Sequence, residues 1–169
     1  MARTMKEILD LKQELLMGNF DEAIKLTTEL ETIAYQDKLN AIKSFLTLIV
    51  SRLILLQVGK YIYMSNIYEI RNSLLEIQLR NRLGDGFYIQ GDSCWQKLIE
   101  QSIPWALLIA AEETELREEM DVSQLKEVVD YKLLQVEALS IIRLIFSLDA
   151  YGLDQYLRSR WINKQLIRY

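Results

Sequence analysis

The sequence predicts an all-α protein, a single-domain helical bundle of about six or seven helices. The chain has 169 residues, of which one is proline and six are glycine. So few helix breakers over this length favour long helices over many short strands. Half of the residues are hydrophobic and 26% are charged, which is the composition of a globular chain with a core. No segment rich in serine, proline and glycine divides the chain, so one domain is expected.

An N-terminal helical hairpin is the first expected element. Thr4 and Glu7 have the spacing of a capping box for the first helix, and Gly18 is expected to end that helix. Asn19 and Glu22 repeat the spacing at the start of a second helix. Because only a short Gly-Asn link joins the two helices, they are expected to form an αα-hairpin. Their apolar positions recur at helical spacing: Ile8, Leu11, Leu15, Leu16, Ala23, Ile24, Leu26, Leu30 and Ile33.

A third helix is expected to start at Asp37, and its segment 42–58 is apolar almost all round. A helix of this kind lies in the middle of a bundle or at a subunit interface. The segment is shorter than the roughly 20 residues of a membrane span, and a charge such as Arg52 in mid-span would be costly. We therefore interpret it as a buried core helix and expect no transmembrane segment.

The middle of the chain is expected to hold a helix, a loop and then further helices. Ser65 caps the fourth helix, and three glycines bracket a loop over 84–91, whose residues 87–89 pin it to the core. A fifth helix starts near Asp92. Pro104 then marks the end of that helix or the first turn of the next, with Ser102 as the cap.

Two oppositely charged segments follow. The acidic stretch over 112–121 is interpreted as a solvated helix end, with a site for a basic partner as the alternative. A long helix from Asp121 or Ser123 is expected to break at Gly152. Residues 1–148 would form the bundle, and residues 149–169 a basic amphipathic C-terminal helix. The basic residues of this last helix are Arg158, Arg160, Lys164 and Arg168, beside a single acid, Asp154.

The composition argues against catalysis, because the chain contains no histidine. Histidine is the commonest general base at neutral pH and the commonest metal ligand. Cys94 is the only cysteine, and it is interpreted as a small core residue beside Trp95 because no base would activate it. We expect no enzymatic activity, no cofactor and no metal site, including one at the Glu112–Glu113–Glu115 cluster, where a histidine partner is missing.

Two arginines, Arg52 and Arg143, lie within apolar runs. The first interpretation places each at the edge of the bundle, with its stem packed and its guanidinium in water. The alternative is an ion pair between helices or subunits. The carboxylates considered as acceptors for it are Glu69, Glu76, Asp130 and Glu137.

A family resemblance rests on the text GNFDEAIKLTTELETIAYQDKLNAIKSFLTLIVSRLILLQ, followed by SNIYEIRNSLLEIQLRN and GDGFY. The stretch from Met17 to Tyr88 resembles the bacterial, largely cyanobacterial, helical family known as domain of unknown function twenty-nine. The residues that fit its Ile-Arg-Asn…Glu-Ile-Gln segment are Ile70, Arg71, Asn72, Glu76, Ile77, Gln78 and Asn81. The resemblance implies a helical fold and carries no activity with it.

This chain departs from the family at several positions. Relatives typically show His-Leu-Ile/Leu-Lys where Arg52 to Leu55 stand here, and a tryptophan where Asn66 stands. Basic residues are also usual in the family at four positions that are not basic here: Tyr61, Met64, Leu75 and Leu79. Any role of those groups in the family does not transfer to this chain.

The sequence thus favours a cytoplasmic module that binds a protein partner or itself through apolar helix faces. A homo-oligomer is expected because one bundle of this size would not cover both the third helix and the C-terminal helix. The alternative is a nucleic-acid-associated regulator, a component of a toxin–antitoxin or defence operon, that uses the basic C-terminal helix. An anionic membrane surface is a further partner considered for the same helix. Net charge of −4 gives the whole chain no general attraction for nucleic acid. The candidate contact residues are Arg52, Leu55, Leu56, Tyr156, Arg158, Arg160, Trp161 and Lys164.

Overall fold

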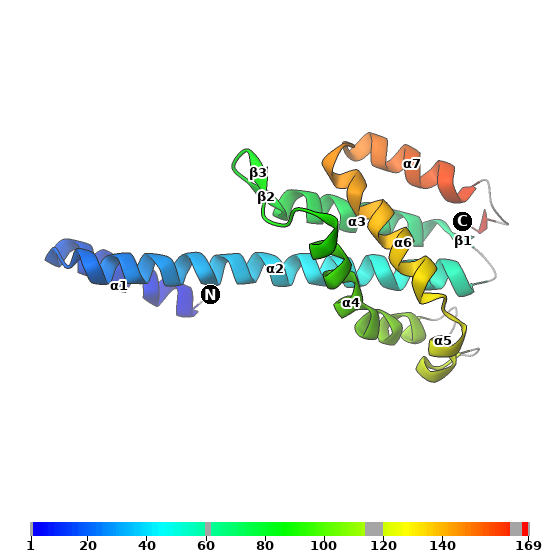
Figure 1. The fold of residues 1–169 in the computed structure, drawn as a ribbon, viewed down its shortest axis with the longest axis horizontal. Coiled ribbons are helices and arrows are strands. Elements are labelled where there is room, and N and C mark those ends of the chain that lie inside the picture. The colour runs from blue at the N-terminus through cyan, green and yellow to red at the C-terminus, as the bar shows by residue number, and fades with distance from the viewer. Residues whose placement is uncertain (1, 60–61, 114–119, 163–166, 169) are drawn as a thin grey trace. The chain divides into compact units, whose positions relative to one another are not determined.

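The computed structural model describes residues 2–59, 62–113, 120–162 and 167–168 (Figure 1). These residues contain seven α-helices and four two-residue strands, so the predicted all-α class is confirmed. The chain divides into two compact units, residues 1–40 and 41–169, and each is described by itself. The expectation of one domain stays a prediction.

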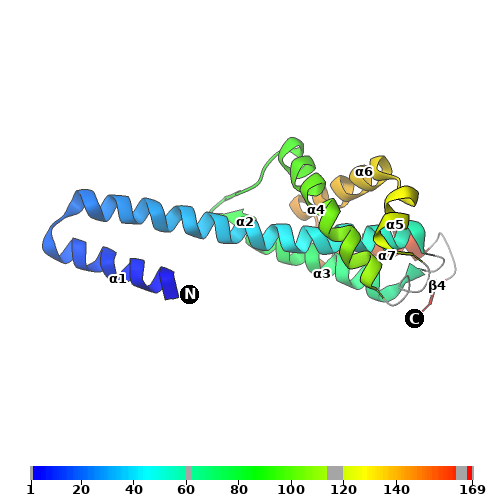
Figure 2. The same ribbon diagram turned by 90° about the horizontal axis from the view of Figure 1, so that it is seen from below.

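The first unit is the predicted hairpin of α1 (Ala2–Met17) and the N-terminal half of α2 (Phe20–Val58). Gly18 has a φ of 78° and reverses the chain, a conformation that favours glycine. The backbone N–H of Asn19 donates to the carbonyl of Glu14 at 3.0 Å, and its side-chain amide donates to the Glu14 carboxylate at 2.7 Å. The two helices lie antiparallel, as Figure 2 shows.

The third helix expected from Asp37 is not separate, because α2 continues unbroken from Phe20 to Val58. Asp37 is exposed and no glycine or proline lies near it, so nothing forces the helix to end there. Segment 42–58 is a core helix as predicted. Its almost completely buried side chains are Ile42, Leu46, Ile49, Val50, Leu53 and Ile54.

By length and composition α2 is also the one described helix that could cross a membrane. Half of its most apolar window, 50%, is buried inside the structure, and a core helix of a soluble protein meets the same criteria. The expectation of no transmembrane segment therefore stays a prediction.

In the second unit, α3 (Met64–Arg80) is followed by a small hairpin of β2 (Arg82–Leu83) and β3 (Gly86–Phe87). Asn81 is fully buried at the base of this hairpin. Its amide donates to the carbonyl of Ile89 at 3.1 Å and accepts from the backbone N–H of Ile89 at 2.7 Å. Ile89 is 5% exposed, so the loop is fixed to the core as predicted.

Helix α4 (Asp92–Glu112) is one continuous helix with Pro104 inside it, where the sequence predicted a boundary. Pro104 is exposed, so water can reach the carbonyl that loses its helical N–H partner. Ser102 is not a cap. It is buried and donates to the carbonyl of Leu98 at 2.8 Å. Cys94 is exposed while Trp95 is buried, so the core placement predicted for the cysteine is wrong.

The long helix predicted from Asp121 to Gly152 is divided into α5 (Val122–Val128), α6 (Tyr131–Ile142) and the 3₁₀ turn η1 (Arg143–Phe146). Asp130 causes the first break, because its carboxylate accepts from the backbone N–H of Leu133 at 3.0 Å and caps α6.

The C-terminal helix α7 covers Ala150–Ile162 and includes Gly152, so this glycine does not end a helix. Asp149 accepts from the backbone N–H of Gly152 at 2.8 Å. Strand β4 (Ile167–Arg168) pairs in parallel with β1 (Ile62–Tyr63). The C-terminal helix is therefore shorter than the predicted 149–169.

Candidate interaction surfaces

The hairpin of residues 1–40 leaves most of its apolar side chains in solvent. Ala23 is its only buried side chain among those described. On α1, Met5 is 63% exposed, Leu9 59% and Leu16 80%. The half-buried positions of α1 are instead mostly acidic: Glu7, Asp10, Leu11 and Glu14. The hairpin therefore presents an apolar face that α2 does not cover.

Spacing places this face in one line along α1. Met5, Leu9, Lys12 and Leu16 are separated by four, three and four residues, a period that keeps them on one side of a helix. We call these four residues the α1 stripe. Their spacing is the same in both directions along the helix, so two antiparallel copies would pair Met5 with Leu16 and Leu9 with Lys12. The stem of Lys12 can cover apolar surface while its charge stays in water.

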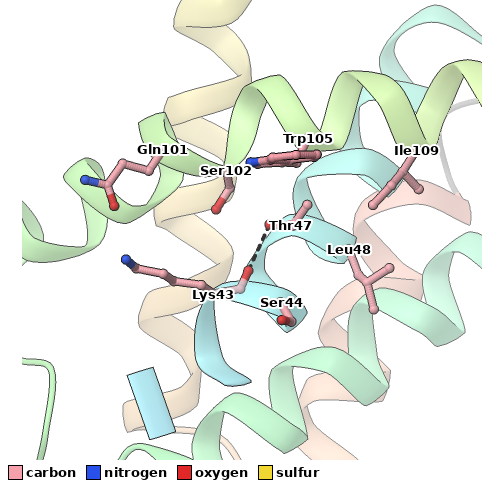
Figure 3. Close-up of a pocket in the computed structure, with 8 residues that line it drawn as sticks. All are labelled: Lys43, Ser44, Thr47, Leu48, Gln101, Ser102, Trp105 and Ile109. Atoms are coloured by element: carbon pink, nitrogen blue, oxygen red, sulfur yellow. Dashed lines mark hydrogen bonds between the residues drawn. The ribbon is translucent and has the colours of Figure 1, made fainter. Parts of the chain in front are cut away.

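A second surface is a groove between α2 and α4, with a volume of about 590 Å³ (Figure 3). We call it the α2–α4 groove, and its lining residues are Lys43, Ser44, Thr47, Leu48, Gln101, Ser102, Trp105 and Ile109. Lys43 and Gln101 lie toward one end, and Leu48, Trp105 and Ile109 lie toward the other. The groove thus has a polar end and an apolar end.

Two of the hydroxyls that line this groove are already bonded to their own helices. Thr47 donates to the carbonyl of Lys43 at 2.9 Å, and Ser102 donates to that of Leu98 at 2.8 Å. Trp105 is 66% exposed, although Trp95 and Trp161 are almost fully buried. A tryptophan left in solvent at the edge of an apolar groove is typical of a contact residue.

Past the apolar end of the groove, Arg52 joins three helices. Its guanidinium bonds to Glu69 of α3 and, at 2.5 Å, to Glu113 at the end of α4. Burial lowers the pKa of Arg52, but the bonds to Glu113 and Glu69 outweigh that effect and hold the pKa above its ordinary value. Arg52 lies one turn beyond Leu48, and Glu113 one turn beyond Ile109, so this ion pair links α2 to α4.

The interpretation of Arg52 as an edge residue with its head in water is therefore wrong, because its side chain is only 9% exposed. Glu69 was among the acceptors considered, whereas Glu113 was not. Arg143 has the exposure of the edge interpretation but also forms the ion pair between helices of the alternative, from η1 to Asp92 of α4. Its side chain is 57% exposed and it pairs with Asp92.

The Arg143–Asp92 pair gives a pH-dependent prediction. The hydrogen bond from Arg143 holds the pKa of Asp92 below its ordinary value of 3.8. Because the folded-state pKa is depressed, the pair's small contribution to stability is present above pH 3.8 and lost as pH falls through the folded-state pKa. Arg143→Gln is expected to return the Asp92 carboxyl to about 3.8 in an NMR titration. An unchanged pKa would show that the pair does not persist in solution.

Most of the other candidate contact residues are buried or half-buried within the second unit. Leu55 is 3% and Trp161 6% exposed, so neither is open to a partner in this conformation, and Leu56 and Tyr156 are half-buried. Lys164 lies outside the described residues.

The two described arginines of the C-terminal helix have acidic partners. Arg158 bonds to Asp154 at 2.7 Å, and Arg160 contacts Glu137 at 3.4 Å. Arg158 also donates to the Tyr68 hydroxyl at 2.9 Å, and Arg160 to that of Tyr156 at 3.0 Å. Their positive charge is therefore partly balanced within the molecule.

Sequence reasoning missed Trp105 and most of the α1 stripe. Trp105 was not singled out among the candidate contact residues. The buried apolar positions of this part of α4 are Ile103, Ala106, Leu107 and Ala110. That spacing leaves Trp105 off the inner face, which was a usable signal. In α1, Met5 and Leu9 make the apolar face of the helix wider than one neighbouring helix can cover. The sequence alone shows this width.

Comparison of the chain with protein-family models, curated proteins and solved structures gives no match. The resemblance to the family known as domain of unknown function twenty-nine therefore stays a prediction. Among the described residues, no three histidine, cysteine or acidic side chains gather in a way that could hold a metal ion.

Proposed function

We propose that this protein is a non-enzymatic assembly module that acts through apolar helix faces. The observation that carries this proposal is the α1 stripe, whose three apolar side chains are each more than half exposed. An amphipathic helix gains most of its stability by burying its apolar face. A two-helix hairpin with one buried side chain among those described has not done so.

The partner we propose for the stripe is a second copy of this chain. A two-fold dimer needs a surface that complements itself, and the four–three–four spacing of the stripe has this property. Two hairpins would form a four-helix bundle, in which each helix has an inner face. On the same hairpin, Phe20 is 66% and Ile24 65% exposed, so α2 offers further apolar surface to such a bundle.

Light scattering on the full chain tests this proposal. The wild type is expected to have twice the chain mass of 19.9 kDa over the micromolar range. The double variant Met5→Glu, Leu16→Glu is expected to have the single-chain mass, because the antiparallel pairing would bring each new carboxylate against a new carboxylate of the other copy. Its far-UV circular dichroism is expected to stay helical, since both positions are exposed in the monomer.

Lys25→Glu is the matched control, because Lys25 is exposed on α2 outside the stripe and the substitution changes the net charge by two, as the double variant does. This variant is expected to remain a dimer. A wild type with the single-chain mass throughout, or a control that dissociates as readily as the double variant, would overturn the proposal.

The alternative of a nucleic-acid-associated regulator has less support. It requires free positive charge on the C-terminal helix, whereas Arg158 and Arg160 have acidic partners within the molecule. A cytoplasmic location and the absence of catalysis remain expectations from the sequence.

A further inference from the structure

We propose that the α2–α4 groove binds a small amphipathic carboxylate, with the carboxylate at the Lys43–Gln101 end. The apolar body of the ligand would lie along Leu48, Trp105 and Ile109. This site belongs to the second unit and does not depend on the assembly of the hairpin.

The size and walls of the groove suit such a ligand. Its volume of about 590 Å³ lies within the range of about 300–1,000 Å³ that small-molecule sites occupy. Trp105 provides a broad aromatic surface that is 66% exposed, and Figure 3 shows it on the same stretch of the groove as Leu48 and Ile109. Covering these side chains with a hydrocarbon body would remove apolar surface from water.

The middle of the groove does not require a polar ligand to satisfy the hydrogen bonds of Thr47 and Ser102. The hydroxyls of Thr47 and Ser102 already donate to carbonyls one turn back in their own helices. Their donors are therefore satisfied without a ligand. A hydrocarbon body lying over them would leave no donor unpaired, whereas a polar body would lose its water without replacement.

The polar end selects a negative head group. Among the described residues, no carboxylate pairs with the ammonium of Lys43, and Gln101 beside it is exposed. A carboxylate at this end could accept charge-assisted hydrogen bonds from Lys43 and a further bond from the Gln101 amide.

The opposite end fixes the direction of binding. Arg52 is the cation past the apolar end of the groove, and its guanidinium is already bonded to Glu69 and Glu113. A ligand carboxylate placed there would face two carboxylates as well as the arginine. The head group is therefore directed to Lys43.

The test uses decanoate and 1-decanol, which share an apolar chain and differ in the head group, below their aggregation limits. Trp105 is the reporter, because the other two tryptophans are at most 6% exposed. Decanoate is expected to change tryptophan emission and to reduce quenching by acrylamide. It is expected to bind about tenfold more tightly than decanol, because only decanoate pairs with Lys43.

Lys43→Gln is expected to remove that difference by weakening decanoate about tenfold and leaving decanol unchanged. The matched control is Lys97→Gln, an exposed lysine of α4 that does not line the groove; it is expected to leave both affinities unchanged. The Met5→Glu, Leu16→Glu variant is expected to bind decanoate like the wild type, which separates this site from the proposed assembly.

Four results would overturn the proposal. One is equal affinity for decanoate and decanol, and another is an equal loss of decanoate affinity in the Lys43 and Lys97 variants. The third is a Trp105 signal that neither ligand changes. The fourth is a Trp105 that acrylamide does not quench even without ligand, because the groove would then already be covered.

Discussion

Asn81→Ala is expected to lower the free energy of unfolding by about 2–4 kcal/mol. Asn81 is fully buried, and its side chain forms both a donor and an acceptor bond with the backbone of Ile89. Alanine would remove both bonds and leave the N–H and the carbonyl of Ile89 unpaired beside the core. An unpaired buried group costs about 1–3 kcal/mol, so two of them set the lower bound of about 2 kcal/mol. The upper bound is about 4 kcal/mol because larger losses are exceptional for one substitution.

Urea denaturation would measure this loss, and hydrogen exchange would locate it. The amide of Ile89 is expected to exchange faster in Asn81→Ala, because its acceptor is the Asn81 side chain. Asn81→Asp keeps this acceptor and loses the donor, so its Ile89 amide is expected to stay more protected than in the alanine variant. Asn72→Ala, at an exposed position of α3, is the control and is expected to change stability by less than about 0.5 kcal/mol. Equal stability of the Asn72 and Asn81 variants would contradict the proposed anchoring role.

The residues that carry the family resemblance include two such anchors. Gln78 donates to the carbonyls of Ile145 at 2.8 Å and Leu148 at 3.0 Å, which holds the end of η1 and the residues after it against α3. Asn81 holds the loop that follows α3 through its two bonds to Ile89. The sequence shows both side chains but not their partners, since Gln78 and Ile145 are 67 residues apart. A local pattern cannot predict such a pairing.

Local signals did predict parts of the fold. The Gly18-Asn19 link gave the hairpin because glycine with a positive φ is the usual way to end a helix and reverse the chain. The failures came from capping residues. Asp37 has the chemistry of a cap but lies inside α2, while Asp130 caps α6 although a continuous helix was expected. A capping residue alone therefore does not predict a helix boundary, because no glycine or proline lies near Asp37 and α2 continues through it.

The candidate surfaces were harder to predict than the fold. Trp161 and Trp105 look alike in the sequence, as aromatic side chains within amphipathic segments. The structure buries Trp161 to 6% exposure and leaves Trp105 at 66%, because only Trp161 lies on the inner face of its helix. Which apolar side chain stays in solvent depends on how wide an arc the neighbouring elements cover, and this is a property of the packed fold.

Arg52→Ala is expected to lower the free energy of unfolding by about 1–3 kcal/mol. Removing one partner of a fully buried ion pair typically costs about 3–5 kcal/mol, because a charge remains without compensation. Here the remaining charges would be Glu69 and Glu113, whose side chains are 48% and 31% exposed. Water can reach both carboxylates, so the expected loss is smaller. Denaturation by urea, with unchanged cooperativity, would measure it.

Removing the two carboxylates instead of the arginine separates the contribution of charge from that of the packed arginine stem. Glu69→Gln with Glu113→Gln would leave the guanidinium, which is 9% exposed, without a carboxylate. Arg52→Met keeps much of the buried stem and removes the charge, so both glutamates can turn to water. The double glutamine variant is therefore expected to be less stable than Arg52→Met. If Arg52→Met were instead the less stable of the two, the charges of the two ion pairs would not be what holds α2, α3 and α4 together at Arg52. The guanidinium would then contribute to stability mainly through its shape and its hydrogen bonds. The amide side chains of glutamine can accept those hydrogen bonds as well as the carboxylates do.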